Sequence, residues 1–171
     1  MTRLQTPLNM HTLARPALTI RKAEERDLPG IATLVRMHYD STGFPLDVTY
    51  DADKVASYLV GLMVSLDCLL LVAADGEQVV GTLGMALADT FFSAAVGARE
   101  LFLYVRPEYR GQHAGVQMIH MAEDWARVNG ASVIIIGNHP LSPPHVATTY
   151  QRHGYREAQT DFTKRLTMEK A

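Results

Sequence analysis

A tight-turn signal between two apolar runs is the feature that most constrains how this chain folds. Residues 69–73 form a continuous apolar run, Asp75 and Gly76 follow it closely, and residues 79–87 form a second apolar stretch. Glycine adopts the positive φ that a two-residue hairpin turn needs, so this pattern predicts two antiparallel strands. Residues 101–105 form a third strand-like run. The whole segment is therefore expected to fold as a three-stranded antiparallel meander.

Two glycines and the alternation of side chains give the first indications of packing within this meander. Gly81 and Gly84 lie inside the second strand, where a missing side chain indicates a bulge or close packing. In the third strand, simple alternation places Glu100 on the same face as Phe102 and opposite to Leu101. These residues are therefore expected to face the two sides of the sheet in turn.

Before the meander, the sequence predicts one strand and two helices. Residues 18–22 alternate between apolar and polar, as in a half-buried strand, and Asp27 and Asp51 are each suited to begin a helix. The second helix has the clearest amphipathic stripe, at positions i, i+3, i+4, i+7, i+8 and i+11. This stripe consists of Val55, Tyr58, Leu59, Leu62, Met63 and Leu66.

After the meander, the pattern predicts alternating helices and strands. A helix is expected over residues 116–129, and an apolar strand over 132–136. Ser142 is expected to cap a helix that runs to about residue 153, and residues 155–166 to form a final strand or hairpin. This order of elements predicts an α/β fold with a mixed sheet.

The length of the chain suits one domain with a full core. The sequence has 171 residues, of which 47% are hydrophobic and 20% charged, so a wholly disordered chain is excluded. Residues 1–16 are mixed and polar, and we expect them to form a flexible N-terminal arm. Residues 17–171 are expected to form the single domain.

The charge and the cysteine count exclude several classes of protein. A formal net charge of -2 provides no global positive field, so no nucleic acid partner is expected. The single cysteine, Cys68, excludes an intramolecular disulfide framework and a cysteine-based zinc cluster, and it favours a reducing, cytoplasmic location. No apolar run approaches the roughly 18 residues that span a bilayer. We therefore expect no metal and no membrane partner.

One segment combines the features of a phosphate site. A predicted strand enters a thin turn that contains Arg110, Gly111 and Gly115, and this turn opens a helix. The first N–H groups of a helix have no internal partner, and such an end binds phosphate when no side chain blocks it. A Walker-type loop needs Gly-Lys-Ser/Thr, and a Rossmann loop follows the first strand of a parallel unit; neither pattern is present. A tight turn without a ligand is the alternative to a phosphate site.

The run Arg110-Gly-Gln-His-Ala-Gly115 resembles the acyl-CoA pyrophosphate loop of the GNAT superfamily of N-acetyltransferases. That loop reads Arg or Gln, two residues, Gly, one residue, and Gly or Ala. Arg110 and Gly115 match it, whereas His113 stands where the middle glycine is usual. The order of elements from residue 18 to about 166 is also similar to the family's. The resemblance implies a mixed central sheet with flanking helices and a splay between the two central parallel strands.

The resemblance also implies acetyl-CoA as the cosubstrate and a set of residues that would hold it. Strand amides would bind the pantetheine arm, one of them would polarise the thioester carbonyl, and loop amides would bind the pyrophosphate. Asn138 would take the place of an asparagine that the family often has at the start of a later helix. The implied set is Leu103, Tyr104, Val105, Arg110, Gly111, Gln112, His113, Ala114, Gly115, Val116 and Asn138.

The same resemblance implies direct transfer of an acetyl group from CoA to a primary amine, and it suggests two catalytic residues. Tyr150 precedes Gly154 by four residues, as the family's catalytic tyrosine does, and its phenol would donate a proton to the leaving sulfur. Glu100 begins the strand that feeds the loop and is the candidate base. His139 and His145 are rivals for that role.

The acceptor is expected to be a small-molecule or peptide amine. Its site would lie between residues 39–50, residues 89–97 and the final hairpin. Asp40, Asp47 and Asp51 would attract a cationic amine, although turn and cap roles explain them more simply. The alternative function is a catalytically silent module that senses acyl-CoA or serves in assembly. A homodimer is compatible with this sequence.

Overall fold

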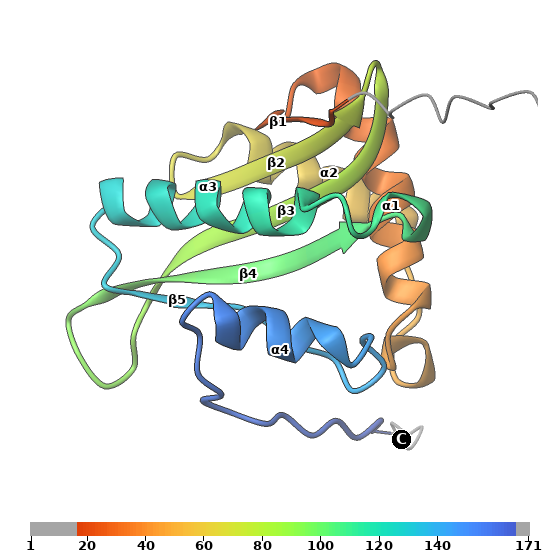
Figure 1. Cartoon of the computed structure of the whole chain (residues 1–171). Helices are drawn as coiled ribbons and strands as arrows, with labels where there is room; N and C mark the ends of the chain where they lie inside the picture. Colours follow the sequence, from red (N-terminus) through yellow and green to blue (C-terminus); the bar gives the residue numbers. More distant parts are fainter. Residues whose placement is uncertain (1–16, 167–171) are drawn as a thin grey trace, which may run out of the picture.

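The computed structural model describes residues 17–166, and these form one mixed sheet with helices on both faces (Figure 1). The strand order is β1-β2-β3-β4-β5, antiparallel up to β4 and parallel between β4 and β5. The strands are β1 Thr19–Lys22, β2 Cys68–Asp75, β3 Gln78–Asp89, β4 Val96–Val105 and β5 Val133–Ile135. The predicted α/β fold with a mixed sheet is confirmed.

The helices divide between the two faces of the sheet. Figure 1 shows α3 in front of the strands and α1 and α2 behind them, and two separate apolar cores correspond to these layers. The α-helices are α1 Leu28–Asp40, α2 Ala52–Val64, α3 Ala114–Val128 and α4 His145–Arg152. Short 3-10 turns occupy η1 Glu25–Asp27, η2 Phe44–Leu46 and η3 Pro107–Tyr109.

The continuous apolar run of β2 is explained by these two cores. Leu71 packs into the core under α3, whereas Leu70 and Val72 pack into the core under α1 and α2. A strand that is buried on both faces has no need of polar alternation. The predicted hairpin between β2 and β3 forms, but its turn residues are Gly76 and Glu77, since Asp75 still pairs with Gln78. Gly76 adopts a φ of +59°, as the tight turn requires.

The predicted apolar stripe of α2 is only partly buried. Leu59 and Leu62 lie in the core, and the carboxylate of Asp51 accepts the backbone N–H of Lys54 at 3.0 Å, which confirms the helix cap. Leu66 is 90% exposed because the helix ends two residues before it. The stripe therefore continues past the end of the helix that it helped to predict.

A bulge in β4 changes the face on which its side chains lie. Gly84 pairs with Phe102 and Met85 pairs with Glu100, so Leu101 has no partner in the β3–β4 ladder. Leu101 consequently packs with Phe102 in the core under α1 and α2. The prediction that these two side chains face opposite sides was wrong, because an extra residue in a bulge shifts the alternation by one.

The glycine at this bulge is explained by a close approach. A Cβ on Gly84 would lie 2.6 Å from the Cζ atom of Phe102, which is closer than carbon atoms pack. The indication of close packing in β3 is therefore confirmed at this position.

The two parallel strands separate after a short stretch of pairing. Gly97, Ala98 and Arg99 pair with residues 133–135, whereas residues 100–105 at the C-terminal end of β4 have no β5 partner. The expected splay between the central parallel strands is present. It leaves backbone groups of β4 without strand partners on the side where β5 diverges.

The predicted final strand is absent. Residues 155–166 have no regular secondary structure, and Phe162 is 94% exposed. The side chain of Thr163 donates a hydrogen bond to Asp47 at 2.7 Å, which places this segment beside the loop after α1. A strand needs an edge to pair with, and the three residues of β5 offer a short one. The predicted N-terminal arm, residues 1–16, lies outside the described residues.

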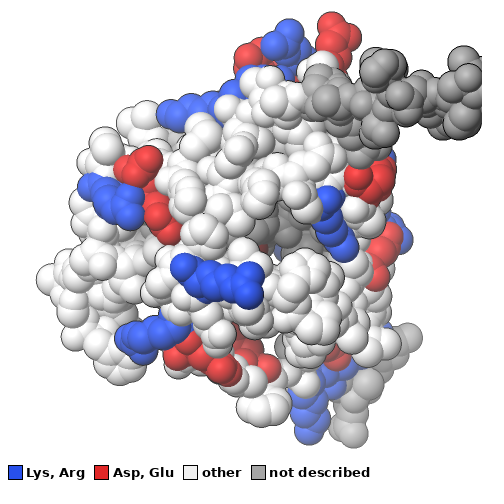
Figure 2. Space-filling view, viewed as in Figure 1, with Lys and Arg blue, Asp and Glu red and all other residues white. Residues whose placement is uncertain are grey.

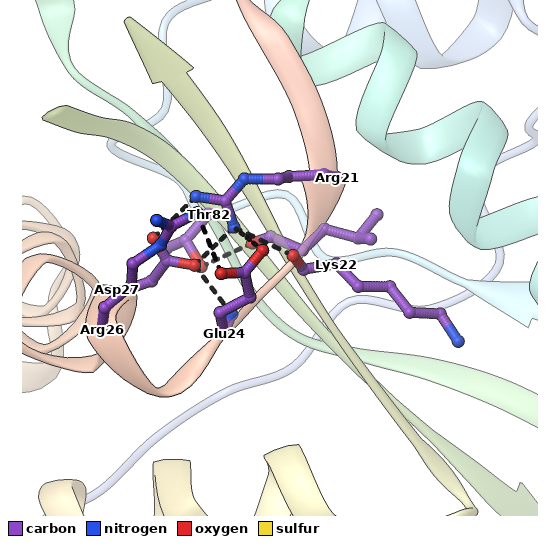
Figure 3. A network of polar contacts seen from close by, with 7 residues as sticks. Arg21, Lys22, Glu24, Arg26, Asp27 and Thr82 are labelled. Carbon is purple, nitrogen blue, oxygen red and sulfur yellow. Dashed lines mark hydrogen bonds and ion pairs between the residues drawn. The ribbon is translucent and has the colours of Figure 1, made fainter. Parts of the chain in front are cut away.

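A polar network joins β1 to the start of α1 (Figure 3). The guanidinium of Arg21 donates two hydrogen bonds to the buried carboxylate of Asp27, at 2.6 and 2.9 Å. The same carboxylate accepts the backbone N–H of Glu24 at 2.7 Å. The hydrogen bonds from Arg21 hold the pKa of Asp27 below its ordinary value. Asp27 begins the helix as predicted, but through this network and not through a side-chain cap.

Candidate active site

The turn between β4 and α3 presents unbonded backbone amides. Gly111 and His113 both adopt positive φ, at +82° and +61°. The backbone N–H of Gln117 bonds to the carbonyl of His113 at 2.9 Å. Among residues 17–166, no acceptor is bonded to the amides of residues 113–116. These amides and the helix dipole can bind an anion.

His113 adopts the left-handed backbone conformation, which favours glycine. It is a non-glycine residue in the left-handed region, where L side chains pay a conformational cost. The side chain is exposed and makes no cap bond to the helix. This loop therefore holds a non-glycine residue in the left-handed region at the expense of local strain.

Arg110 lies against the end of β4. Its Nε donates to the carbonyl of Val105 at 3.0 Å, and its guanidinium carbon lies 5.4 Å from the ring centre of Tyr104. The Arg110 cation therefore lies at the end of β4, where the strand enters the turn. The structure therefore brings the strand part and the loop part of the predicted cofactor-binding set together at one end of the splay. That set is Leu103, Tyr104, Val105, Arg110, Gly111, Gln112, His113, Ala114, Gly115 and Val116.

Glu100 lies at the point where β4 separates from β5. Its carboxylate accepts the backbone N–H of Gly137 at 2.8 Å and so connects the two diverging segments. Burial raises the pKa of Glu100 to about 7, although the hydrogen bond from Gly137 opposes that rise. A carboxylate with this pKa can exchange a proton near neutral pH.

Tyr150 lies on α4 and packs against the core on the α3 side of the sheet. Burial, followed by the nearby charge of Glu100, raises the pKa of Tyr150 above its ordinary value. Its phenol therefore stays protonated and can act only as a proton donor at neutral pH. The hydroxyl of Tyr155 donates to Glu123 of α3 at 2.8 Å, which anchors the segment after α4.

Three other polar residues that the sequence analysis singled out, Asn138, Ser142 and His145, lie in different places around the splay and α4. Asn138 is exposed and directly follows Gly137, on the β5 side of the splay. His145 is exposed at the start of α4, away from the lining of the cavity described next. Ser142 was predicted to cap this helix, but α4 begins only at residue 145. The Ser142 side chain instead accepts the backbone N–H of His139 at 3.2 Å, because a turn forms there first.

A cavity of about 500 Å³ opens beside Glu100, between α1, the loop after it, the start of α2, β4 and the segment after β5. Its lining includes His139, which was considered as a base, and His38, which the sequence analysis did not single out. The two imidazole rings meet edge to face with centres 5.5 Å apart. Burial, with a smaller effect from His139, lowers the pKa of His38 to about 4. The only sequence signal for His38 was its position at the end of an apolar stripe in α1, formed by Leu28, Ile31, Leu34 and Val35.

The lining of this cavity agrees in part with the expected acceptor walls. The loop of residues 39–50 contributes to it, but residues 89–97 and the C-terminal segment do not. The three candidate aspartates are engaged: Asp40 binds Arg36, Asp47 accepts Thr163, and Asp51 caps α2. The predicted cap role is therefore confirmed for Asp51, whereas Asp40 forms an ion pair within α1 and Asp47 bonds to the C-terminal segment.

Charged side chains are scattered over the face of the molecule drawn in Figure 2. Figure 2 shows small mixed groups of acidic and basic residues on this face, with no continuous basic patch. Within residues 17–166, no cluster of three or more ligating side chains could hold a metal ion. No helix in this part of the chain has both the length and the apolar character to cross a membrane.

Comparison with known proteins places the chain in a family. A sequence model of the acetyltransferase (GNAT) domain matches residues 67–157, more than half of the chain. No curated relative matches the chain. Solved structures of similar fold exist, and the match spans nearly the whole length of each of the structures described next.

Three of these structures illustrate the likeness. One is a transcriptional regulator from Bacillus halodurans C-125, with 21% identity, a TM-score of 0.71, and coverage of 87% of this chain and 99% of that chain. A second is AAC(6')-Iy in complex with the bisubstrate analog CoA-S-monomethyl-acetylneamine, with 12% identity, a TM-score of 0.72, and coverage of 88% and 99%. A third is an aminoglycoside acetyltransferase from an uncultured soil metagenomic sample in complex with sisomicin, with 18% identity, a TM-score of 0.66, and coverage of 88% and 97%. At these identities the likeness shows the fold alone, whereas the matched domain shows that this chain belongs to the GNAT family of acetyltransferases.

Proposed function

We propose that this protein is an acetyl-CoA-dependent N-acetyltransferase that acetylates a primary amine by direct attack on the thioester. One observation carries the proposal: the carboxylate of Glu100, whose pKa burial raises to about 7, lies at the splay beside a cavity of about 500 Å³. The strand that carries Glu100 leads into the turn with open amides. A proton acceptor and an anion site thus occupy one continuous segment of the chain.

The residues present fit acetyl-CoA as the cosubstrate. The amides of residues 113–116 and the cation of Arg110 suit a diphosphate, and the β4 edge without a β5 partner suits an amide-containing arm. A structure of similar fold holds a CoA-containing bisubstrate analog. Asn138 would contact the same cosubstrate from the β5 side.

In the proposed reaction, each proton has an assigned residue. The amine nitrogen forms a bond to the acetyl carbon while the bond from that carbon to sulfur breaks. Glu100 accepts the proton that the amine loses, and Tyr150 donates a proton to the departing sulfur. The surroundings of the two groups suit these roles. Glu100 has a pKa of about 7 and can accept a proton near neutral pH, whereas the raised pKa of Tyr150 keeps its phenol protonated. A cytoplasmic location, based on the free thiol of Cys68, belongs to the same proposal.

The test is release of CoA by the full-length protein incubated with acetyl-CoA and a panel of amines. The panel contains arylalkylamines, polyamines, aminoglycosides, amino acids and peptide N-termini, and a blank without amine corrects for hydrolysis. Amine-dependent release of the thiol with at least one member supports the proposal. Tight binding of acetyl-CoA without release on any amine would instead identify a silent sensor or assembly module, and no binding would refute both functions.

A further inference from the structure

We propose that the acceptor carries a single primary amine on a compact apolar or aromatic body, which binds in the cavity beside Glu100. This inference rests on the proposed function and specifies its substrate class. It follows from what lines the cavity and from which charges are already engaged there.

The cavity wall is mainly apolar and aromatic. Side chains from α1, the loop after it and β4 form this wall: Val35, Tyr39, Phe44, Val48, Tyr50 and Phe102. Phe44 is 42% exposed and Val48 is 58% exposed, so both offer apolar surface that a ligand would remove from water. A cavity of about 500 Å³ lies within the range that small organic ligands occupy.

The wall has few carboxylates available for a polycation. Among the described lining residues, Glu100 and Asp51 are the acidic ones, and Asp51 already accepts the N-terminal amide of α2. Lys54 and Arg99 bring positive charge to the same cavity. The hydrogen bond leaves the charge of Asp51 in place, so a ligand with several ammonium groups would meet two carboxylates and two like charges, with no excess of negative charge to bind a polycation.

The neighbouring acidic residue on α1 is also engaged. Asp40 binds Arg36 at 2.9 Å, and the guanidinium of Arg36 lies 4.8 Å from the ring centre of Tyr50 in the wall. Asp40 therefore offers a distant ammonium group little net attraction, because its charge is compensated. One amine at Glu100 is the charge pattern that this cavity accommodates.

The two histidines extend the aromatic wall without adding positive charge. The ring of His139 meets Phe44 and His38 edge to face, each with centres 5.5 Å apart. Burial lowers the pKa of both His38 and His139, so these rings are neutral at pH 7. Neutral aromatic rings attract an ammonium group and do not repel it.

The test compares three amines in calorimetric binding to the full-length protein saturated with CoA. 2-Phenylethylamine has one amine and a ring, butylamine lacks the ring, and spermidine has additional ammonium groups. We expect 2-phenylethylamine to bind at least about tenfold more tightly than the other two, because only the ring can bury apolar area against the wall. Equal or tighter binding of spermidine, or no binding of any amine, would overturn the inference.

Variants connect the preference to this cavity. Phe44→Ala should weaken 2-phenylethylamine binding by about tenfold and leave spermidine binding unchanged, because it removes a ring from the wall. Phe91→Ala is the matched control, since Phe91 is 95% exposed and does not line the cavity. Equal losses in both variants would overturn the inference.

Turnover separates this inference from the proposed function. Release of CoA with spermidine but not with 2-phenylethylamine would keep the proposed function and refute the substrate class. Selective binding of 2-phenylethylamine without release of CoA would refute the proposed function and support the cavity's preference.

Discussion

The two sides of the splay are built in different ways. The turn side consists of consecutive residues from the end of β4 to the start of α3, and its chemistry is that of backbone amides. The cavity side brings together α1, the loop after it, β4 and the segment after β5, and its chemistry is that of side chains. Glu100 lies where the two sides meet.

This difference shows which part of such a site tolerates change. Backbone amides are available to any sequence that follows the same path, so His113 can replace a glycine while the amides of the turn remain open. Side chains on separate elements must each be specified, and every substitution among them alters the wall. We therefore expect the turn to determine cosubstrate binding and the cavity to determine the choice of acceptor.

The largest expected effect is that of Glu100→Gln, which tests the junction between the two sides. A general base contributes about 10²- to 10⁴-fold to a rate, so kcat should fall within that range. In the unchanged protein, kcat/KM should rise with pH through about 7, because Glu100 accepts a proton only after losing its own. The variant should lack this rise in a steady-state pH profile.

The control for this prediction is Glu77→Gln, because Glu77 is an exposed carboxylate at the β2–β3 turn. It should retain both the rate and the pH profile. If Glu100→Gln kept the rise near pH 7, another group would be the base.

Tyr150→Phe should have the next largest effect. Loss of the proton donor is expected to lower kcat by about 10²-fold, at the low end for acid catalysis, without weakening CoA binding. The raised pKa of Tyr150 means that it contributes no pH-dependent limb near neutrality. Tyr58→Phe on the exposed face of α2 is the control, and an unchanged kcat in Tyr150→Phe would remove Tyr150 from the mechanism.

Gly84→Ala tests the cavity side, because Gly84 packs directly against Phe102 in the cavity wall. The new Cβ would overlap the ring of Phe102, which lines the cavity, so we expect a loss of about 1–3 kcal/mol in the free energy of unfolding. The KM for the amine should rise while CoA binding is retained, because the turn is built from other residues. Urea denaturation and steady-state kinetics measure the two effects.

Gly61→Ala is the matched control, because nothing lies within 4 Å of a Cβ at this exposed helical position. It should stabilise the protein by roughly 0.5–1 kcal/mol. Equal changes in both variants would show that Gly84 is not constrained by Phe102.

His113→Gly should give the smallest effect, and it tests the turn side. Removing a left-handed L residue relieves about 1–2 kcal/mol, and the added freedom of glycine in the unfolded chain costs about 0.5–1 kcal/mol. We expect a net gain between zero and about 1.5 kcal/mol in the free energy of unfolding, with the KM for the amine unchanged. Gly111→Ala should change stability in the opposite direction, because φ is +82° there. Destabilisation by His113→Gly would contradict the assignment of strain.

Local patterns predicted most elements, and long-range pairing accounts for the errors. Asp51 and Gly76 act locally, through a cap and a turn, and both were predicted. The prediction that Leu101 and Phe102 face opposite sides of the sheet was wrong, because the side on which Leu101 lies depends on the register of β4 against β3. The final strand was wrong because a strand at residues 155–166 needs an edge that the short β5 does not offer.

The candidate site divides in the same way. A single contiguous motif predicted the turn around Arg110. The spacing to Gly154 singled out Tyr150, whose role as proton donor stays a prediction. His38 was missed because its meeting with His139 depends on the packing of α1 against the sheet. The raised pKa of Glu100 was not predictable either, because burial at the splay causes it.

The sequence by itself determined the mixed α/β fold and the strand–turn–helix segment with open amides, because both depend on periodicity and on the conformations of neighbouring residues. Only the tertiary structure decided which side chains surround the acceptor cavity and what charge they carry. Burial and contacts between distant elements set those properties, and a linear sequence does not contain them until the chain has folded.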